Sequence, residues 1–209
     1  MRPNPSVEAR PNGRPPGPGR WYGYIFTGPG LASCRWSRLT SNVRRRRMTF
    51  SLLQLSKTAL EALAASRVPE GLETRIEQDS LPPAFVAARS LELAAAGHPA
   101  PWSTTFLIVN NEDTRIIGGC GFKTAPLNGR VEVGYGVAPA AQGQGAATAA
   151  LHLLLQRAFE AGAIEVLAEV EPINHASIRV VQKAGFKNVG SRINNENEYV
   201  VQWAKRSEA

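Results

Sequence analysis

Cysteine is scarce in this sequence, and long apolar runs are missing from it. The 209 residues include two cysteines, Cys34 and Cys120, whose positions show neither a pairing pattern nor the spacing of a metal site. We therefore expect a reducing, cytoplasmic environment, no metal centre, and a role for Cys120 as a small core residue. No apolar run approaches the roughly 18 residues that a membrane-spanning helix requires, so we expect no membrane partner.

Acidic residues are almost absent from the first 47 positions. This stretch holds ten arginines, no lysine and one acid, Glu8, together with seven of the 15 prolines. Ten positive charges against one negative give +9, which leaves −2 of the chain's +7 for residues 48–209. The basic character therefore belongs to the N-terminal stretch, and we expect the folded part not to bind nucleic acid.

Residues 1–47 carry no hydrophobic periodicity and are predicted to be a disordered tail. An arginine-rich leader could be an organellar transit segment, or a basic arm for nucleic acid or a membrane surface. It could also be an extension upstream of a chain that starts at Met48, and the change of composition at that residue favours this third reading. The predicted organisation is a tail, 1–47, and one domain, 48–209.

Hydrophobic periodicity and turn residues predict the elements of that domain. They predict a strand over 52–55, a helix capped by Ser56 and running to Ser66, a helix over 84–96, strands over 104–109, 115–124 and 131–137, a helix over 146–161, a strand over 164–170, a helix over 176–184 capped by Asn174, and a hairpin of 186–193 with 197–203. This order indicates an α/β (α+β) fold with a mixed sheet and helices on its faces. Gly118, Gly119 and Gly121 indicate a bulge or a close backbone contact within one strand.

The stretch between the strand 131–137 and the helix from Ala146 is a glycine loop, Gln142-Gly-Gln-Gly145. A strand that leads through such a loop into a helix N-terminus presents free backbone N–H groups and the positive end of the helix dipole. The Gly-Lys-Ser/Thr of a nucleotide-hydrolysing loop is missing, as is the glycine spacing of a dinucleotide fingerprint. The loop therefore predicts a phosphate-bearing ligand without naming it, and a purely structural turn would also explain it.

Three segments considered together resemble the GCN5-related N-acetyltransferases, most of all their ribosomal-protein and small-amine branch. These segments are Glu132–Ala147, Glu169–Val180 with the sequence EVEPINHASIRV, and Lys183–Phe186. The resemblance covers about residues 50–205. It implies the acyl-CoA N-acyltransferase fold, whose mostly antiparallel sheet is splayed at its centre, and acetyl-CoA as cosubstrate. It further implies direct acetyl transfer to an amine, such as a protein N-terminus, an amino acid or a small amine, by a monomer or homodimer.

The same resemblance implies roles for individual residues. The pyrophosphate would lie on the amides of Gln144 to Ala147, with Gln142 and Gly143 shaping its approach. The acetyl carbonyl would lie beside the backbone of Val137, the pantetheine arm against Asn174, and the sulfur near Ser177. Arg179 and Lys183 could meet the 3′-phosphate. The implied cofactor residues are Val137, Gln142, Gly143, Gln144, Gly145, Ala146, Ala147, Asn174 and Ser177.

Direct attack requires a neutral amine and therefore a base. The candidates are Glu132 and Glu169, with water alone as a third alternative. Alternation along the strand puts Glu132 on the face opposite Val137, so it could equally be structural. Some relatives protonate the thiolate with a tyrosine in the helix after Asn174. That position is Val181 here, which leaves Ser177 as the implied donor. In a non-catalytic acyl-CoA-binding module, the alternative function, both glutamates would be structural.

Overall fold

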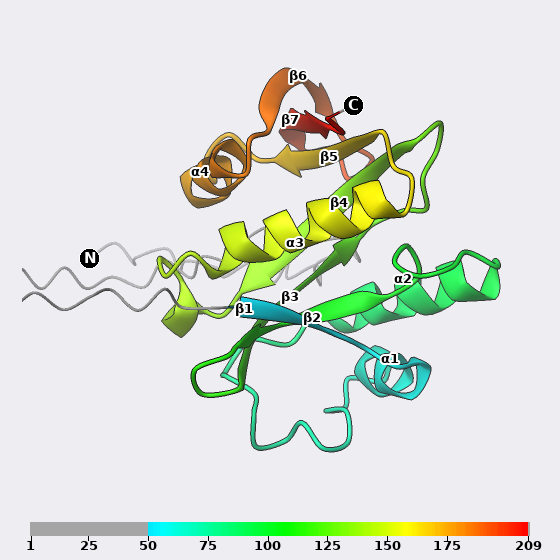
Figure 1. The fold of residues 1–209 in the computed structure, drawn as a ribbon, viewed down its shortest axis with the longest axis vertical. Coiled ribbons are helices and arrows are strands. Elements are labelled where there is room, and N and C mark those ends of the chain that lie inside the picture. Colours follow the sequence, from blue (N-terminus) through cyan, green and yellow to red (C-terminus); the bar gives the residue numbers. More distant parts are fainter. Residues whose placement is uncertain (1–49, 209) are drawn as a thin grey trace, which may run out of the picture.

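The computed structural model describes residues 50–208, so the predicted tail and its boundary at Met48 lie outside the described residues. Seven strands form one sheet, and four α-helices pack on it (Figure 1). In chain order the elements are β1 (Phe50–Gln54), α1 (Lys57–Ala64), α2 (Ala84–Ala95), β2 (Thr105–Asn110), β3 (Arg115–Phe122), β4 (Arg130–Val137), the 3-10 helix η1 (Pro139–Ala141), α3 (Ala146–Glu160), β5 (Glu165–Val170), α4 (His175–Lys183), β6 (Lys187–Ile193) and β7 (Tyr199–Arg206).

The sheet has the order β1-β2-β3-β4-β5-β7-β6, and each neighbouring pair except β4 and β5 is antiparallel. The parallel pairing of β4 with β5 is short, since it joins only Arg130–Glu132 to Glu165–Leu167. Beyond Glu132 the two strands separate. The predicted mixed, mostly antiparallel sheet that is splayed at its centre is thereby confirmed.

Alternate residues of β2 enter two separate cores, which places helices on both faces of the sheet. Phe106 and Ile108 pack in the cluster that contains the inner face of α3, whereas Leu107 and Val109 pack in the cluster that contains α1 and α2. Figure 1 shows α3 crossing the sheet in front of its central strands. The helix residues that close the two cores are Leu151, Leu154, Leu155 and Ala158 on one face, and Leu60, Leu63 and Ala87 on the other.

The elements predicted from the sequence are all present, and the differences lie at their ends. Ser56 caps α1, because its Oγ accepts a hydrogen bond from the Ala59 N–H at 3.2 Å. That helix ends at Ala64 rather than at the predicted Ser66, and β3 ends two residues before the predicted end. The last strand continues to Arg206, three residues beyond the prediction, along the whole length of β5.

Gly118 lies on β3 in close contact with the backbone of β4. A Cβ atom on it would be 2.2 Å from the carbonyl oxygen of Gly136 and 3.0 Å from the Cα of Val137. The register between β2 and β3 also shifts at the neighbouring pair, between Ile108 and Val109. The bulge and the close contact expected from the glycines of this strand are both confirmed.

A buried carboxylate fixes the closed end of the gap between β4 and β5. Glu165 of β5 accepts hydrogen bonds from Arg206 Nε of β7 at 2.8 Å and from Arg130 Nε of β4 at 2.5 Å. The hydrogen bond from Arg206 and that from Arg130 hold the pKa of Glu165 below its ordinary value, against the opposing effect of burial. Three strands are therefore tied together at the point where the parallel pairing is complete.

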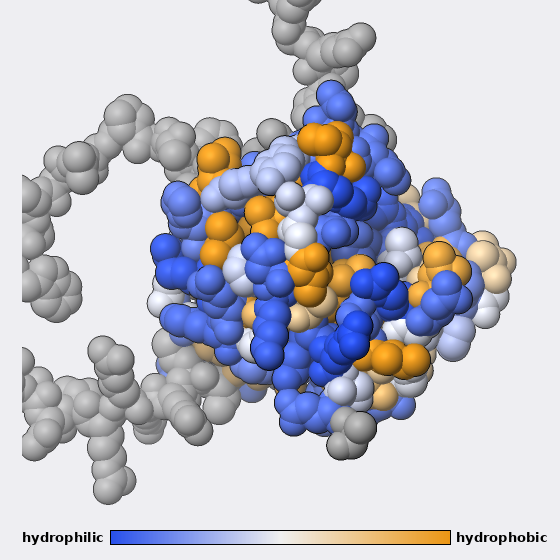
Figure 2. All heavy atoms as spheres, turned by 90° about the horizontal axis from the view of Figure 1, so that it is seen from above, coloured by the Kyte–Doolittle hydropathy of each residue, from blue (hydrophilic) through white to orange (hydrophobic). Residues whose placement is uncertain are grey.

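The surface at the end that holds β6 and β7 is mostly hydrophilic. Seen from that end, its apolar side chains form small separate groups rather than one continuous area (Figure 2). Exposed apolar residues of the chain include Ile173, Val189 and Ile193. Single exposed apolar side chains are ordinary on a protein surface, so the cavities are the better guide to a site.

Candidate active site

The edge of β4 that faces the gap carries backbone groups without a strand to receive them. Glu132 O accepts the Lys123 N–H, and the Ala138 N–H donates to Ile117 O, both at 2.8 Å, so the even-numbered residues of β4 point toward β3. Alternation then directs the N–H groups of Val133, Tyr135 and Val137 toward β5. Because β5 has diverged there, these donors face an open gap, and the backbone predicted beside the acetyl carbonyl, that of Val137, is among them.

The loop after β4 leads into α3 through two left-handed glycines. Gly143 has φ 76° and Gly145, the N-cap of α3, has φ 90°, a region that favours glycine. A Cβ at either position would meet no atom within 4 Å, so open space lies in front of both. The N–H groups of Ala146, Ala147 and Thr148 belong to the first helical turn and have no partner inside the helix. These amides and the two glycines, called the anion cradle below, lie where the sequence predicts a phosphate-binding loop with the amides of Gln144 to Ala147 as its donors.

Two glutamine side chains fasten this loop. Gln142 donates through Nε2 to Val137 O at 3.2 Å, and Gln144 donates through Nε2 to Ala140 O at 3.3 Å. The first bond ties the loop to the end of β4, next to the gap. The resemblance implied that Gln142 shapes the approach of the ligand and that the Gln144 amide binds the pyrophosphate. The structure adds that both side chains position the loop itself.

A cavity of about 370 Å³ extends from the cradle to α4. Gln144 alone among the predicted cofactor residues does not line it. Arg179 and Lys183 project into it from α4, one turn apart, so that two cations face the same space as the cradle. The lining residues are Tyr135, Gly136, Val137, Ala141, Gln142, Gly143, Gly145, Ala146, Ala147, Thr148, Asn174, Ala176, Ser177, Arg179, Val180 and Lys183.

Asn174 and Ser177 form the N-terminus of α4 at the edge of this cavity. Asn174 Oδ1 accepts a hydrogen bond from the Ser177 N–H at 3.0 Å, and both residues are buried. The predicted cap is therefore confirmed. Ser177 also lines a narrow slot between the diverging strands, together with Val133, Gly134, Tyr135, Ala168, Glu169 and Val170. The slot is the inner end of the gap.

Tyr135 is a residue that the sequence analysis missed. It lines both the cavity and the slot, and its hydroxyl donates to the Ser177 carbonyl oxygen at 3.4 Å. Burial raises the pKa of Tyr135 to about 12, so the hydroxyl stays protonated at neutral pH. Tyr135 and Val137 are two residues apart on β4, so their side chains lie on the same face of the sheet. This alternation was the signal in the sequence that could have revealed Tyr135.

The two predicted carboxylates lie at the other mouth of the slot, in a second cavity of about 510 Å³. Glu169 is buried and accepts hydrogen bonds from Arg192 Nε at 2.6 Å, Arg192 Nη2 at 3.1 Å and Gln202 Nε2 at 2.9 Å. Glu132 pairs with Lys123 Nζ at 2.5 Å. Glu169 lines the slot as well as this cavity, whereas Glu132 lines only the cavity.

Cys120 is a core residue. Cys120 is fully buried in the core, where burial raises the pKa of its thiol, as expected of a small core residue. No group of three His, Cys, Asp or Glu side chains in this part of the chain could hold a metal ion. Nor does this part contain a helix whose length and apolar character would let it cross a membrane.

Comparison with known proteins agrees with the fold. The model of the acetyltransferase (GNAT) domain matches residues 56–187. The ribosomal-protein-S5-alanine acetyltransferase of Vibrio fischeri superposes with a TM-score of 0.55 at 17% identity, over 75% of this chain and 92% of that one. RimJ of Mycobacterium smegmatis, solved with a CoA disulfide, superposes with a TM-score of 0.54 at 19% identity, over 76% of this chain and 82% of that one. Similarity at this level concerns the fold.

One curated relative is similar in sequence. The uncharacterized N-acetyltransferase p20 of Bacillus licheniformis is 33% identical over 87 residues, which are 41% of this chain. The aligned part spans about half, 49%, of that relative's length.

The splayed sheet and the glycine loop at a helix N-terminus define the acyl-CoA N-acyltransferase fold. The chain belongs to the GNAT acetyltransferase family. The resemblance stated from its motifs is thus confirmed at the level of the family.

Proposed function

We propose that this protein transfers an acetyl group from acetyl-CoA directly to a primary amine. The observation that carries the proposal is a slot between β4 and β5 with a cavity at each mouth: one contains the anion cradle, the other Glu169. Ser177 is shared by the first cavity and the slot, and Glu169 by the slot and the second cavity. A thioester entering from one side and an amine entering from the other would meet inside the sheet.

The residues of the first cavity fit CoA. The open space before Gly143 and Gly145 leaves room for phosphate oxygens, and the first-turn amides of α3 point into it. Arg179 and Lys183 add positive charge for a further phosphate. Bound acetyl-CoA would supply an activated thioester, whose carbonyl oxygen would accept the N–H of Val137 in the gap. That donor is fixed before the reaction, which is what stabilisation of a developing oxyanion requires.

Glu169 is the better placed of the two candidate bases, because it alone reaches both the slot and the acceptor cavity. Its bonds from Arg192 and Gln202 orient the carboxylate, which would take the proton of the amine through water. The nitrogen then bonds to the acetyl carbon and the carbon–sulfur bond breaks. The thiolate takes a proton, so the products are an acetamide and the CoA thiol.

The function is tested by following thiol release from acetyl-CoA with a panel of primary amines. We expect release with at least one amine, and a kcat about 100-fold lower for Glu169→Gln, at the lower end of general-base effects. Glu132→Gln is the matched control, since it also removes one carboxylate from an ion pair in the same cavity. Its kcat should fall less than that of Glu169→Gln. Melting temperatures of both variants show whether the lost ion pairs affect folding. CoA binding without turnover of any amine, unaltered by Glu169→Gln, would instead identify a non-catalytic acyl-CoA-binding module.

Tyr135 offers a second donor to the leaving thiolate, besides Ser177. Replacement by phenylalanine should lower kcat about tenfold, the effect of one hydrogen bond to a charged atom, and leave CoA binding unchanged. Because the pKa of Tyr135 is about 12, the wild-type rate should show no loss from ionisation of this hydroxyl at neutral or mildly alkaline pH. Single-turnover rates for Tyr135→Phe and Ser177→Ala decide between the donors. A full rate for Tyr135→Phe with an impaired Ser177→Ala would assign the role to Ser177.

The division at Met48, the cytoplasmic location and the monomeric or homodimeric state stay predictions. That the folded domain does not bind nucleic acid also stays a prediction.

A further inference from the structure

One cation of the acceptor cavity forms no ion pair with the four carboxylates that line it, Glu92, Glu132, Glu169 and Glu196. Three basic residues line the cavity: Arg89, Lys123 and Arg192. Lys123 pairs with Glu132, and Arg192 pairs with Glu169. Arg89 has neither an ion pair nor a hydrogen bond within residues 50–208, although it is half-buried. The side-chain nitrogens of Arg89 are not among the buried unpaired atoms of residues 50–208, so the guanidinium stays open to the cavity and can donate hydrogen bonds to a ligand.

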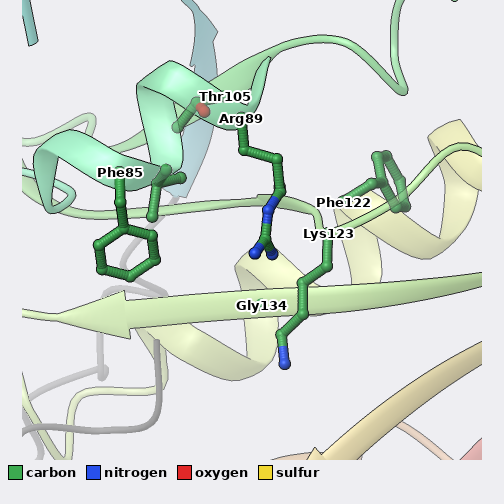
Figure 3. A pocket seen from close by; sticks show the side chains of 8 residues that line it. Phe85, Arg89, Thr105, Phe122, Lys123 and Gly134 are labelled. Atoms are coloured by element: carbon green, nitrogen blue, oxygen red, sulfur yellow. The ribbon is translucent and has the colours of Figure 1, made fainter. Parts of the chain in front are cut away.

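Arg89 lies close to the reacting centre. It extends from α2 toward β4 and, with Lys123, approaches Gly134 (Figure 3). Arg89 and Gly134 both line a small pocket of about 20 Å³ beneath α2, and Gly134 also lines the slot. The guanidinium therefore stands at the junction of the acceptor cavity and the slot. A group bound there would belong to the same molecule as the reacting amine.

We propose that the acceptor is an amine that also carries an anionic group, a carboxylate or a phosphate, a few bonds from its nitrogen. Arg89 would bind this group, because the planar guanidinium donates two parallel hydrogen bonds to such oxygens. Glu169 lines the slot, where the amine would react, and Arg89 lines the acceptor cavity, where the anionic group would bind. This inference rests on the proposed acetyltransferase function and narrows the acceptor to zwitterionic molecules.

The test compares kcat/KM at saturating acetyl-CoA for matched pairs of amines. The pairs are phenylalanine with phenethylamine for the carboxylate, and O-phosphoethanolamine with ethanolamine for the phosphate; spermidine serves as a polycation. We expect the anionic member of one pair to be preferred about tenfold or more, as one charge-assisted contact gives. Which pair shows the preference identifies the anion.

The Arg89→Gln variant should lose that preference through a higher KM for the anionic member, and act on the neutral member as the wild type does. Arg89→Lys keeps the positive charge but cannot donate two parallel hydrogen bonds, so it should retain part of the preference for the anionic member. Arg67→Gln removes an exposed arginine outside the cavity and is the matched control. A preference for the neutral amine or spermidine, or equal losses on both members in Arg89→Gln, would overturn the inference while the acetyltransferase function stands. Absence of thiol release with every amine would overturn both.

Discussion

The Ala147→Glu variant should keep its fold and lose CoA affinity by about a thousandfold. Ala147 is the second residue of α3 and lines the first cavity, so its side chain projects where the pyrophosphate would bind. A carboxylate there meets two phosphate charges of the same sign. Such a juxtaposition costs several kcal/mol, and about 4 kcal/mol corresponds to a thousandfold.

The same substitution is harmless to the helix. An acidic residue in the first turn interacts favourably with the helix dipole, by about 0.3–1 kcal/mol, and no acidic residue occupies the first turn of α3 in the natural sequence. The melting temperature without ligand should therefore be unchanged or slightly higher. Loss of binding with retained stability would separate a ligand effect from an effect on folding.

Calorimetric titration with CoA measures the affinity, and Ala147→Gln is the matched control because it has the size of glutamate without the charge. We expect the glutamine variant to bind far better than the glutamate variant. If both variants bound CoA equally, size rather than charge would be responsible. If Ala147→Glu bound CoA as the wild type does, the pyrophosphate would not lie at the N-terminus of α3.

Local patterns in the sequence were enough to predict most of the fold and the cofactor side of the site. The strand, glycine loop and helix from Val131 to Leu151 are contiguous, so the cradle could be predicted from hydrophobic alternation and glycine positions alone. Asn174 as the cap of α4 was predictable for the same reason. These features depend on neighbours within a few residues along the chain.

The acceptor side could not be predicted in this way, since it is assembled from distant segments. Arg89 comes from α2 and Arg192 from the closing hairpin, and only the topology brings them to one cavity. The pairing of Glu169 with Arg192 depends on β7 lying between β5 and β6, an order that no local pattern specifies. Alternation would have placed Tyr135 on the face of Val137, but it could not show that α4 returns to cover it.

The Gly118→Ala variant should lose about 3 kcal/mol of unfolding free energy, the upper part of the usual range for overpacking. The added methyl would lie 2.2 Å from the Gly136 oxygen, which belongs to the backbone of β4 and cannot rotate aside. In a domain of this size the melting temperature should fall by about 6–12 °C. To accommodate the methyl, β3 and β4 would have to move apart at Val137, whose N–H faces the gap.

Gly136→Ala is the control, because it adds the same methyl to the facing strand, where no atom lies within 4 Å of the new Cβ. Its unfolding free energy, measured by urea titration, should stay near that of the wild type. Equal stability of the two variants would show that the strands adjust at no cost and that the close contact is incidental. A loss confined to Gly118→Ala would instead show that tight packing of β3 on β4 fixes the edge at which the acetyl group is expected to react.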